Sequence, residues 1–169
     1  MNDLAAAVEP GSERLIILPF GNGAERMFRN REIGASVHAL NINIHRQGHL
    51  YRAAQEAIAY SFRFGLEIMK ETGINPTVIR AGESNMFLSK VFRDVLSSLT
   101  STVITLYNTD GSVGAARGAG IGCGFYRTDE EAFSGLEVTG SSEPDPRLAM
   151  IYDARYNEWL DILENHLYE

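Results

Sequence analysis

One stretch of the sequence combines residue types that could bind a ligand, the turn Ala81-Gly82-Glu83-Ser84-Asn85. It follows a short apolar strand and precedes a helical pattern, so free backbone N–H groups and the helix dipole should converge there. Gly82 lacks a Cβ and permits a ligand to approach closely, and the Asn85 amide can donate and accept hydrogen bonds at the edge of a base. Because many α/β turns share these features, the pattern leaves a purely structural turn as the alternative.

Other polar residues offer less chemistry. Asp110 and Glu25 are the carboxylates expected to face a cleft, but nothing pairs them, so a general acid–base role does not follow. His45 and His49 lie four residues apart without the glutamate of a zinc-binding HExxH motif, so a solvated or capping role is predicted. The sequence contains neither a Gly-x-Ser-x-Gly elbow nor a Walker loop. We therefore predict no catalytic and no metal-binding residue.

Glycines recur in a predicted helix over residues 113–126. Gly114, Gly118 and Gly122 fall on one face, and each glycine costs a helix about 1 kcal/mol. Such a stripe makes sense only if another backbone or a ligand comes very close. The spacing does not match a dinucleotide-binding GxGxxG motif, so helix packing is the favoured interpretation. Cys123, the single cysteine, is expected to pack there as a small apolar residue.

Hydrophobic periodicity supplies the elements around these residues. Short strands are predicted at 15–18, 35–40, 78–80 and 103–106, and helices at 2–8, 49–72, 84–99, 113–126, 128–133 and from 146 onward. Asp145 and Pro146 mark the start of the last helix, and residues 20–34 and 137–143 are predicted as loops. The order strand–turn–helix–strand–helix over residues 77–124 suggests a parallel α/β layer, in which ligands bind beyond the carboxyl ends of the strands.

The same periodicity predicts which helix faces are buried. For the helix at 49–72 the inward positions are Leu50, Ala54, Ala57, Ile58, Phe62, Gly65, Ile68 and Met69, with Arg52, Gln55, Glu56, Arg63, Glu67 and Lys70 on the other face. The helix at 84–99, capped by Ser84 or Asn85, should bury Phe87, Leu88, Val91, Phe92, Val95, Leu96 and Leu99. The last helix should bury Leu148, Tyr152, Tyr156, Trp159 and Leu163.

Composition bounds the function classes. At 169 residues, with 44% hydrophobic and 22% charged residues, the chain matches one ordinary globular domain. A net charge of −7 argues against a nucleic-acid partner, and a single cysteine excludes an internal disulfide and a thiolate zinc site. No apolar run reaches the roughly 20 residues that span a bilayer, and the N-terminus has no signal-peptide pattern. We expect a cytoplasmic protein with no membrane partner.

Four segments in order resemble the xylulokinase group of the FGGY carbohydrate kinase family. Residues 17–26 resemble its LPY-x-x-GER segment, residues 49–61 its second signature, residues 81–88 its glycine-rich adenosine loop, and residues 110–122 the helix that follows. The resemblance extends from Leu15 to Tyr126, and the terminal helix also fits. It implies the actin-like (ribonuclease H-like) ATPase fold, an α/β architecture, here its C-terminal portion with mostly parallel strands plus a C-terminal helix.

The resemblance also implies an activity. Members of the family transfer the γ-phosphoryl group of ATP to a sugar, here D-xylulose, with Mg²⁺ and an aspartate base, in a cleft between two domains. Ala81, Gly82, Glu83 and Asn85 would line the adenosine site, and residues 21–26 would shape the edge of the cleft.

Two departures from the family qualify this expectation. The loop begins Ala81-Gly82 where the family usually has two glycines, which relaxes one close approach. The sugar-binding N-terminal domain, the catalytic aspartate and the first strands of the C-terminal domain are not recognised in the sequence. Residues 1–169 are therefore expected to be the adenosine-side C-terminal domain, inactive alone. The alternatives are another FGGY kinase (for gluconate, glycerol or another ketose) and a non-catalytic actin-like module that docks or forms homodimers.

Overall fold

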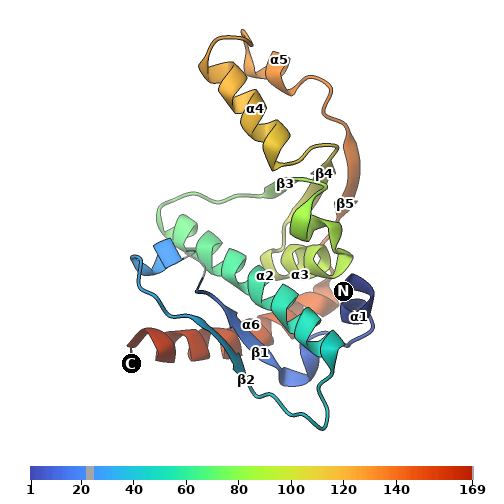
Figure 1. Cartoon of the computed structure of the whole chain (residues 1–169), viewed down its shortest axis with the longest axis vertical. Coiled ribbons are helices and arrows are strands. Elements are labelled where there is room, and N and C mark those ends of the chain that lie inside the picture. The colour runs from blue at the N-terminus through green and yellow to red at the C-terminus, as the bar shows by residue number, and fades with distance from the viewer. Residues whose placement is uncertain (22–24, 169) are drawn as a thin grey trace.

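The strands of the chain form two separate small sheets (Figure 1). The computed structural model describes residues 1–21 and 25–168. In the first sheet, β1 (Ile16–Pro19) pairs antiparallel with β2 (Ala35–His38). In the second, β3 (Val78–Gly82) runs parallel to β4 (Val103–Tyr107), which pairs antiparallel with β5 (Val138–Ser142). The α/β class is as predicted, but the expectation of mostly parallel strands holds only for the β3–β4 pair.

Strand β5 corrects the prediction of a loop at 137–143. Its sequence, Val-Thr-Gly-Ser-Ser, carries little apolar periodicity, and no signal short of the tertiary structure marks it as a strand. Its backbone pairs with β4, with Ser142 opposite Ile104 and Gly140 opposite Leu106. Pairing with an existing strand therefore outweighs weak intrinsic preference.

The described residues form six α-helices: α1 (Asn2–Ala6), α2 (Gln47–Glu71), α3 (Lys90–Thr100), α4 (Gly111–Gly122), α5 (Asp129–Phe133) and α6 (Pro146–Tyr168). The core lies between α2, α3, α6 and the strands. Its largest members come from α6, where Tyr152, Tyr156, Trp159 and Leu163 are all at most 1% exposed, as predicted. Asp145 accepts a hydrogen bond from the Arg147 amide (2.8 Å), which confirms the predicted start of this helix.

Helix α2 buries part of the face that was predicted to be polar. Of the positions predicted to face inward, Ala57 is buried as expected, at 1% exposure, and Ile58 packs partly buried against the core. Leu50, Phe62 and Met69 are 39%, 47% and 39% exposed, whereas Arg52 and Glu56 are 7% and 2% exposed. Gln55 is also buried and accepts a hydrogen bond from the Ser89 hydroxyl.

Burial of the polar face is possible because its charged groups are satisfied by distant parts of the chain. The Glu56 carboxylate accepts hydrogen bonds from the Gly11 amide (2.9 Å), the Ser12 hydroxyl (2.8 Å) and Arg52 Nε (2.9 Å). Arg52 also donates to the carbonyls of Ala5 and Val8 and to the Tyr152 hydroxyl. A paired and fully hydrogen-bonded charge can be buried where an unpaired one is not tolerated. This network fastens the N-terminal segment to α2 and α6.

The predicted helix at 84–99 begins later than expected. A short 3₁₀ turn (Asn85–Leu88) comes first, and Asn85 has a φ of +51°, outside the helical region. Ser89, not Ser84 or Asn85, caps α3 by accepting a hydrogen bond from the Phe92 amide. Leu88 is consequently 59% exposed, contrary to prediction, whereas Val91, Phe92, Val95, Leu96 and Leu99 are buried as predicted.

Helices α4 and α5 form an arm that projects from the rest of the chain (Figure 1). The arm begins and ends at Asn108 and Glu137, which are joined by two hydrogen bonds: Asn108 N–H to the Glu137 carbonyl (3.1 Å) and Glu137 N–H to Asn108 Oδ1 (2.8 Å). No described residue of α4 is buried. Cys123 is exposed, so the prediction that it packs as an apolar residue is wrong: the arm has no core at that position.

The glycine stripe of α4 is likewise uncovered. A Cβ placed on Gly114, Gly118 or Gly122 would meet no heavy atom within 4 Å. The close neighbour that these glycines predict is therefore not supplied by the described part of the chain. Among the helices in the described ranges, none combines the length and apolar character needed to cross a membrane.

Candidate functional site

The four residues predicted to bind a ligand lie on one turn at the carboxyl end of β3. Ala81 and Gly82 are the last residues of the strand, and the Glu83 amide extends its pairing by donating to the Tyr107 carbonyl of β4 (2.9 Å). The Ser84 amide then donates to the Gly82 carbonyl (2.8 Å), which reverses the chain. The turn after β4 leads into α4, so the ends of two parallel strands lie side by side, where α/β folds bind ligands.

Gly82 is required by this arrangement itself. A Cβ at this position would lie 2.3 Å from the Thr109 carbonyl oxygen and 3.3 Å from Asp110 Cα. The close approach that the sequence suggested for a ligand is thus made by the backbone of the neighbouring turn. Glycine at position 82 lets the β3 and β4 turns touch, which joins them into one surface.

Asp110 fixes a negative charge at the start of α4. Its Oδ1 accepts hydrogen bonds from the Ser112 hydroxyl (2.6 Å) and the Val113 amide (2.9 Å). These two donors hold the pKa of the Asp110 carboxyl below its ordinary value. Because this carboxylate already occupies the helix N-terminus and Glu83 is exposed nearby, the edge repels phosphate. It suits an uncharged ligand whose hydroxyl or amino groups donate hydrogen bonds.

Asn85 adds a free polar group to the same turn. Its left-handed backbone conformation (φ +51°) turns the chain into the 3₁₀ segment, and the residue is exposed. Within the described ranges its side-chain amide makes no hydrogen bond, so both donor and acceptor are available to a ligand.

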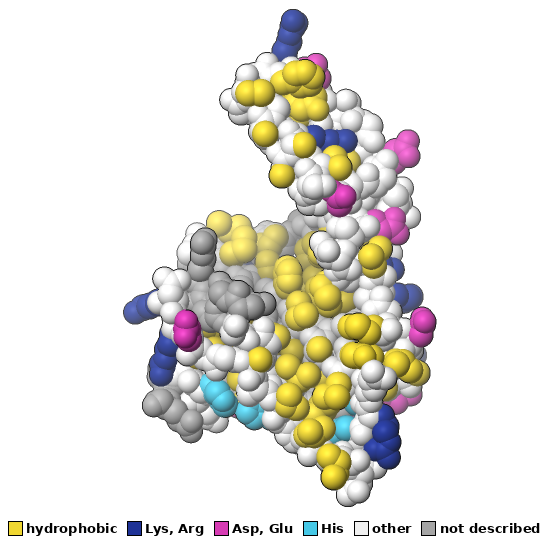
Figure 2. Space-filling view, in the orientation of Figure 1, with side chains coloured by type: hydrophobic (Ala, Val, Ile, Leu, Met, Phe, Trp, Pro, Cys, Tyr) yellow, Lys and Arg dark blue, Asp and Glu magenta, His cyan; other side chains and the backbone are white. Residues whose placement is uncertain are grey.

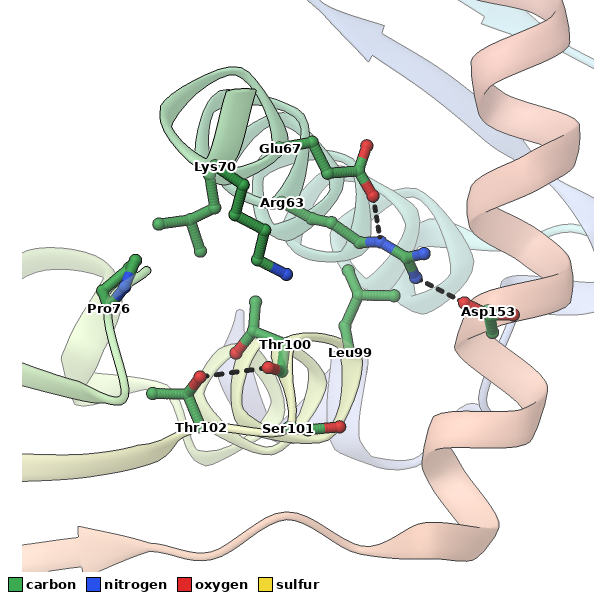
Figure 3. A pocket seen from close by; sticks show the side chains of 10 residues that line it. Arg63, Glu67, Lys70, Pro76, Leu99, Thr100, Ser101, Thr102 and Asp153 are labelled. Atoms are coloured by element: carbon green, nitrogen blue, oxygen red, sulfur yellow. Dashed lines mark hydrogen bonds and ion pairs between the residues drawn. The ribbon is translucent and has the colours of Figure 1, made fainter. Parts of the chain in front are cut away.

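A cavity of about 320 Å³ lies at the opposite end of the sheet (Figure 3). It is lined by the ends of α2 and α3, by Pro76 and Thr102 before β3 and β4, and by Asp153 of α6. Arg63 pairs with Glu67 (2.9 Å) and with Asp153 (2.6 Å), so its charges are satisfied internally. A second cavity of similar volume lies along α3 and β5. Neither includes the turn from Ala81 to Asn85.

Comparison with known proteins shows which enzymes this chain is similar to. No protein-family model matches the chain. It is 28% identical over 171 residues to the xylulose kinase of Lactococcus lactis, covering 94% of this chain and 32% of that protein. It is 30% identical over 101 residues to the xylulose kinase of Haemophilus influenzae, covering 58% of this chain and 20% of that protein.

Solved structures agree with the sequence matches. The xylulose kinase of Rhodospirillum rubrum superposes with a TM-score of 0.76 at 24% identity, covering 99% of this chain and 34% of that one. The chain is similar to xylulose kinases in both sequence and structure. A gluconate kinase from Lactobacillus acidophilus (TM-score 0.73, 21% identity) and a Plasmodium falciparum glycerol kinase with ADP (TM-score 0.67, 20% identity) share the fold. It is the actin-like ATPase fold of the FGGY kinases, and the chain spans about a third of the length of these relatives.

The part of the chain that the structure describes contains no candidate metal centre. No group of three or more His, Cys, Asp or Glu side chains is arranged there to hold an ion. His49 accepts a hydrogen bond from the Arg46 amide (3.1 Å) at the start of α2, which confirms the predicted capping role. His45 is buried, at 7% exposure, and accepts a hydrogen bond from the Asn41 amide (2.9 Å), so it is not solvated.

The segment expected to shape the cleft edge, residues 21–26, lies largely outside the described residues. Residues 22–24 and the side chains of Glu25 and Arg26 are not described, so the expectation for Glu25 stays a prediction. Sequence reasoning did miss one contributor to the site, Thr109, whose carbonyl is the partner of Gly82. The turn cluster Asn108-Thr109-Asp110-Gly111 marks a turn, but not which residue it touches.

Proposed function

We propose that the chain is the adenosine-binding part of an ATP-dependent carbohydrate kinase of the xylulose kinase type. The observation that carries the proposal is the pair of touching turns at the carboxyl ends of β3 and β4, with Gly82 against Thr109 and Asp110. The exposed Asn85 lies on the same turn as Gly82. Ala81, Gly82, Glu83 and Asn85 would hold the nucleoside, and the Asp110 carboxylate would accept from a hydroxyl or amino group. ATP, when bound, supplies the phosphoryl group.

The similarity to xylulose kinases supports the rest of the proposed reaction. The intact enzyme would transfer the γ-phosphoryl group to D-xylulose with Mg²⁺, in the cytoplasm, and residues 1–169 would be the C-terminal, adenosine-side domain without its first strands. The sugar-binding domain and the catalytic aspartate would lie in the two thirds of the relatives that this chain does not cover. Such transfer depends on positioning and charge stabilisation from both domains, so the chain alone should not phosphorylate sugar.

Gluconate or glycerol is the alternative substrate. Kinases named for both compounds share the fold at nearly the TM-score of the xylulose kinases. Phosphorylation of a panel of ketoses, gluconate and glycerol by the intact enzyme separates these candidates. The sequence matches, which are to xylulose kinases, favour D-xylulose.

Titration of the isotopically labelled chain with adenosine and with Mg-ATP tests the binding step. We expect backbone amide shifts at residues 81–85 and 108–113 with both ligands, because the site holds the nucleoside and not the phosphates. An unchanged spectrum, or shifts confined to the cavity near Arg63, would contradict the proposal.

A matched pair of variants sharpens this test. Asn85→Gly keeps the left-handed backbone but removes the side-chain amide, so it should weaken binding. Asn30→Gly is the control, because Asn30 is also exposed and has a φ of +62° but lies in another loop. If both variants bind adenosine with equal affinity, the Asn85 side chain does not contribute to binding.

A further inference from the structure

A polar cluster lies buried where the N-terminal segment meets α2 and α6. Charged side chains normally stay at the surface, and on the face that Figure 2 shows they lie mostly along the rim of the main body and on the arm. In the cluster, by contrast, Arg52, Glu56 and Arg155 are all buried. Tyr60 and Tyr152, which carry hydroxyl groups, are buried with them. Each of these polar groups therefore needs a hydrogen-bond partner inside the protein.

The Glu56 carboxylate is the centre of the hydrogen bonds in this cluster. Its Oε1 accepts from the Gly11 amide and from Arg52 Nε, whereas its Oε2 accepts only from the Ser12 hydroxyl. Arg52 in turn donates to the Tyr152 hydroxyl (2.7 Å). Because each carboxylate oxygen can accept two hydrogen bonds, Glu56 Oε2 keeps one free acceptor position.

Two buried polar atoms of the cluster have no hydrogen-bond partner among the described residues. They are the Tyr60 hydroxyl oxygen on α2 and Nη2 of Arg155 on α6. The other terminal nitrogen of Arg155, Nη1, donates to Glu158, so the guanidinium is held in place with Nη2 left over. Buried polar atoms of this kind are rare in folded proteins, and an ordered water molecule is a common reason for them.

Both unpartnered atoms border the same buried space. Tyr60 lies one helical turn after Glu56 on α2. Burial raises the pKa of the Tyr60 hydroxyl, the Glu56 charge raises this pKa further, and the Arg155 charge lowers it, so the hydroxyl faces both groups. On the other side, a Cβ placed on Gly11 would lie 3.3 Å from Arg155 Cγ, and the Gly11 amide donates to Glu56. The side chains of Glu56, Tyr60 and Arg155 therefore surround one polar space.

We propose that this space binds an internal water molecule that bridges α2 to α6. The water accepts hydrogen bonds from Arg155 Nη2 and from the Tyr60 hydroxyl, and it donates one to the free acceptor position of Glu56 Oε2. About three hydrogen bonds is the usual number for an internal water. The same two donors could hold a chloride ion, but the Glu56 carboxylate repels an anion. None of these residues belongs to the proposed nucleoside site.

A high-resolution crystal structure of the chain, together with water deuteron relaxation dispersion in solution, tests the proposal. We expect a water peak within hydrogen-bond distance of both Tyr60 Oη and Arg155 Nη2. Tyr60→Phe should reduce the dispersion by the contribution of one long-lived water. It should also raise the equilibrium constant for unfolding about five-fold, as the loss of one hydrogen bond does.

Tyr126→Phe is the matched control, because it removes the same hydroxyl group at a half-buried position in the arm. It should leave both the dispersion and the unfolding constant unchanged. If Tyr60→Phe does not fold, the crystal structure of the unmodified chain decides the question.

Four results would overturn the proposal. The first is a crystal structure without a peak between the two atoms, and the second is a direct hydrogen bond from Arg155 to the Tyr60 hydroxyl. The third is a peak that gives an anomalous signal when the crystals are grown with bromide, which would assign the site to an anion. The fourth is a Tyr60→Phe variant that is at least as stable as the unmodified chain, because the hydroxyl would then have no partner to lose.

Discussion

Glycines at positions 82 and 114 differ in what a methyl group would meet. At Gly82 a Cβ would lie 2.3 Å from the Thr109 carbonyl oxygen, a backbone atom held by the adjacent turn, whereas at Gly114 it would meet nothing within 4 Å. We expect Gly82→Ala to lower the free energy of unfolding by about 1–3 kcal/mol, the usual cost of forcing extra volume into a packed site. Denaturant unfolding of the variant and the unmodified chain measures this loss of stability.

Gly114→Ala is the control, and it should change stability in the opposite direction to Gly82→Ala. Position 114 lies inside α4 with open space around it, so alanine should stabilise the helix by up to about 1 kcal/mol. Equal stability of Gly82→Ala and the unmodified chain would show that the two turns separate easily and do not form one rigid site.

Single residues were predictable where the signal is local. The turn at Ala81–Asn85 follows from small and polar residues after an apolar run, and the Asp145–Pro146 helix start from capping chemistry alone. The burial of Arg52 and Glu56 was not predictable from the sequence. The partners of Glu56, Gly11 and Ser12, lie 45 and 44 residues away, and Arg52 donates to Val8, 44 residues away, and Tyr152, 100 residues away. Periodicity records polarity and gives no information about distant donors.

The N-terminal cap of α4 depends on the side-chain oxygen of Asp110. Asp110→Ala should speed hydrogen exchange of the α4 amides, because the Val113 amide loses its acceptor, whereas Asp110→Asn should preserve the cap. The folded-state pKa of Asp110 lies below its ordinary value of 3.8. Its contribution is therefore present above pH 3.8 and is lost as the pH falls through the lower, folded-state value.

Exchange measured by NMR or mass spectrometry across this acidic range checks the prediction. The Asn variant should show a weaker pH dependence in α4 than the unmodified chain, since its amide does not titrate. Identical exchange in the Ala and Asn variants would exclude a capping role for this side chain.

Elements with strong periodicity were predicted better than those that depend on pairing. The helices α2 and α6 are recognisable from spacing, and the buried aromatic residues of α6 are as expected. Strand β5 was missed because its small polar residues acquire strand structure only by pairing with β4. Part of the inward face of α2 was assigned wrongly, because apolar spacing gives no sign that Arg52 and Glu56 are paired with each other and hydrogen-bonded by distant residues.

Three buried tyrosines make the stability of the whole molecule fall at alkaline pH. Burial raises the pKa of Tyr152 from its ordinary 10.0 to about 12, with the nearby Glu56 charge adding to the effect. Burial likewise raises the pKa values of Tyr60 and Tyr156. Between pH 10 and 12 the unfolded chain loses protons that the folded chain keeps, so the free energy of unfolding falls as the pH rises.

Denaturant unfolding at a series of pH values, together with tyrosinate absorbance, measures this effect. Tyr152→Phe should reduce the slope over this range, while Tyr126→Phe, at a half-buried position in the arm, should leave it unchanged. A tyrosine titration that is the same in the folded chain and in denaturant would contradict the prediction.

At the scale of the molecule, the likeness to xylulose kinases could be inferred from four short segments in the right order, and the sequence and structural matches agree with it. The projection of α4 and α5 from the rest of the chain could not be inferred from the sequence. Helix α4 has the glycine spacing of a packed helix, and only the three-dimensional arrangement shows that no described residue lies against Gly114, Gly118 or Gly122.

The two hydrogen bonds between Asn108 and Glu137 close the arm at its base, so residues 109–136 can unfold independently of the rest of the chain. Since α4 buries no described residue, the arm can unfold as a separate cooperative unit of low stability while the strands and α6 stay intact. Unfolding of the chain is then not one all-or-none event. The single tryptophan, Trp159, is buried in the main core, so its fluorescence reports the second transition and is silent during the first.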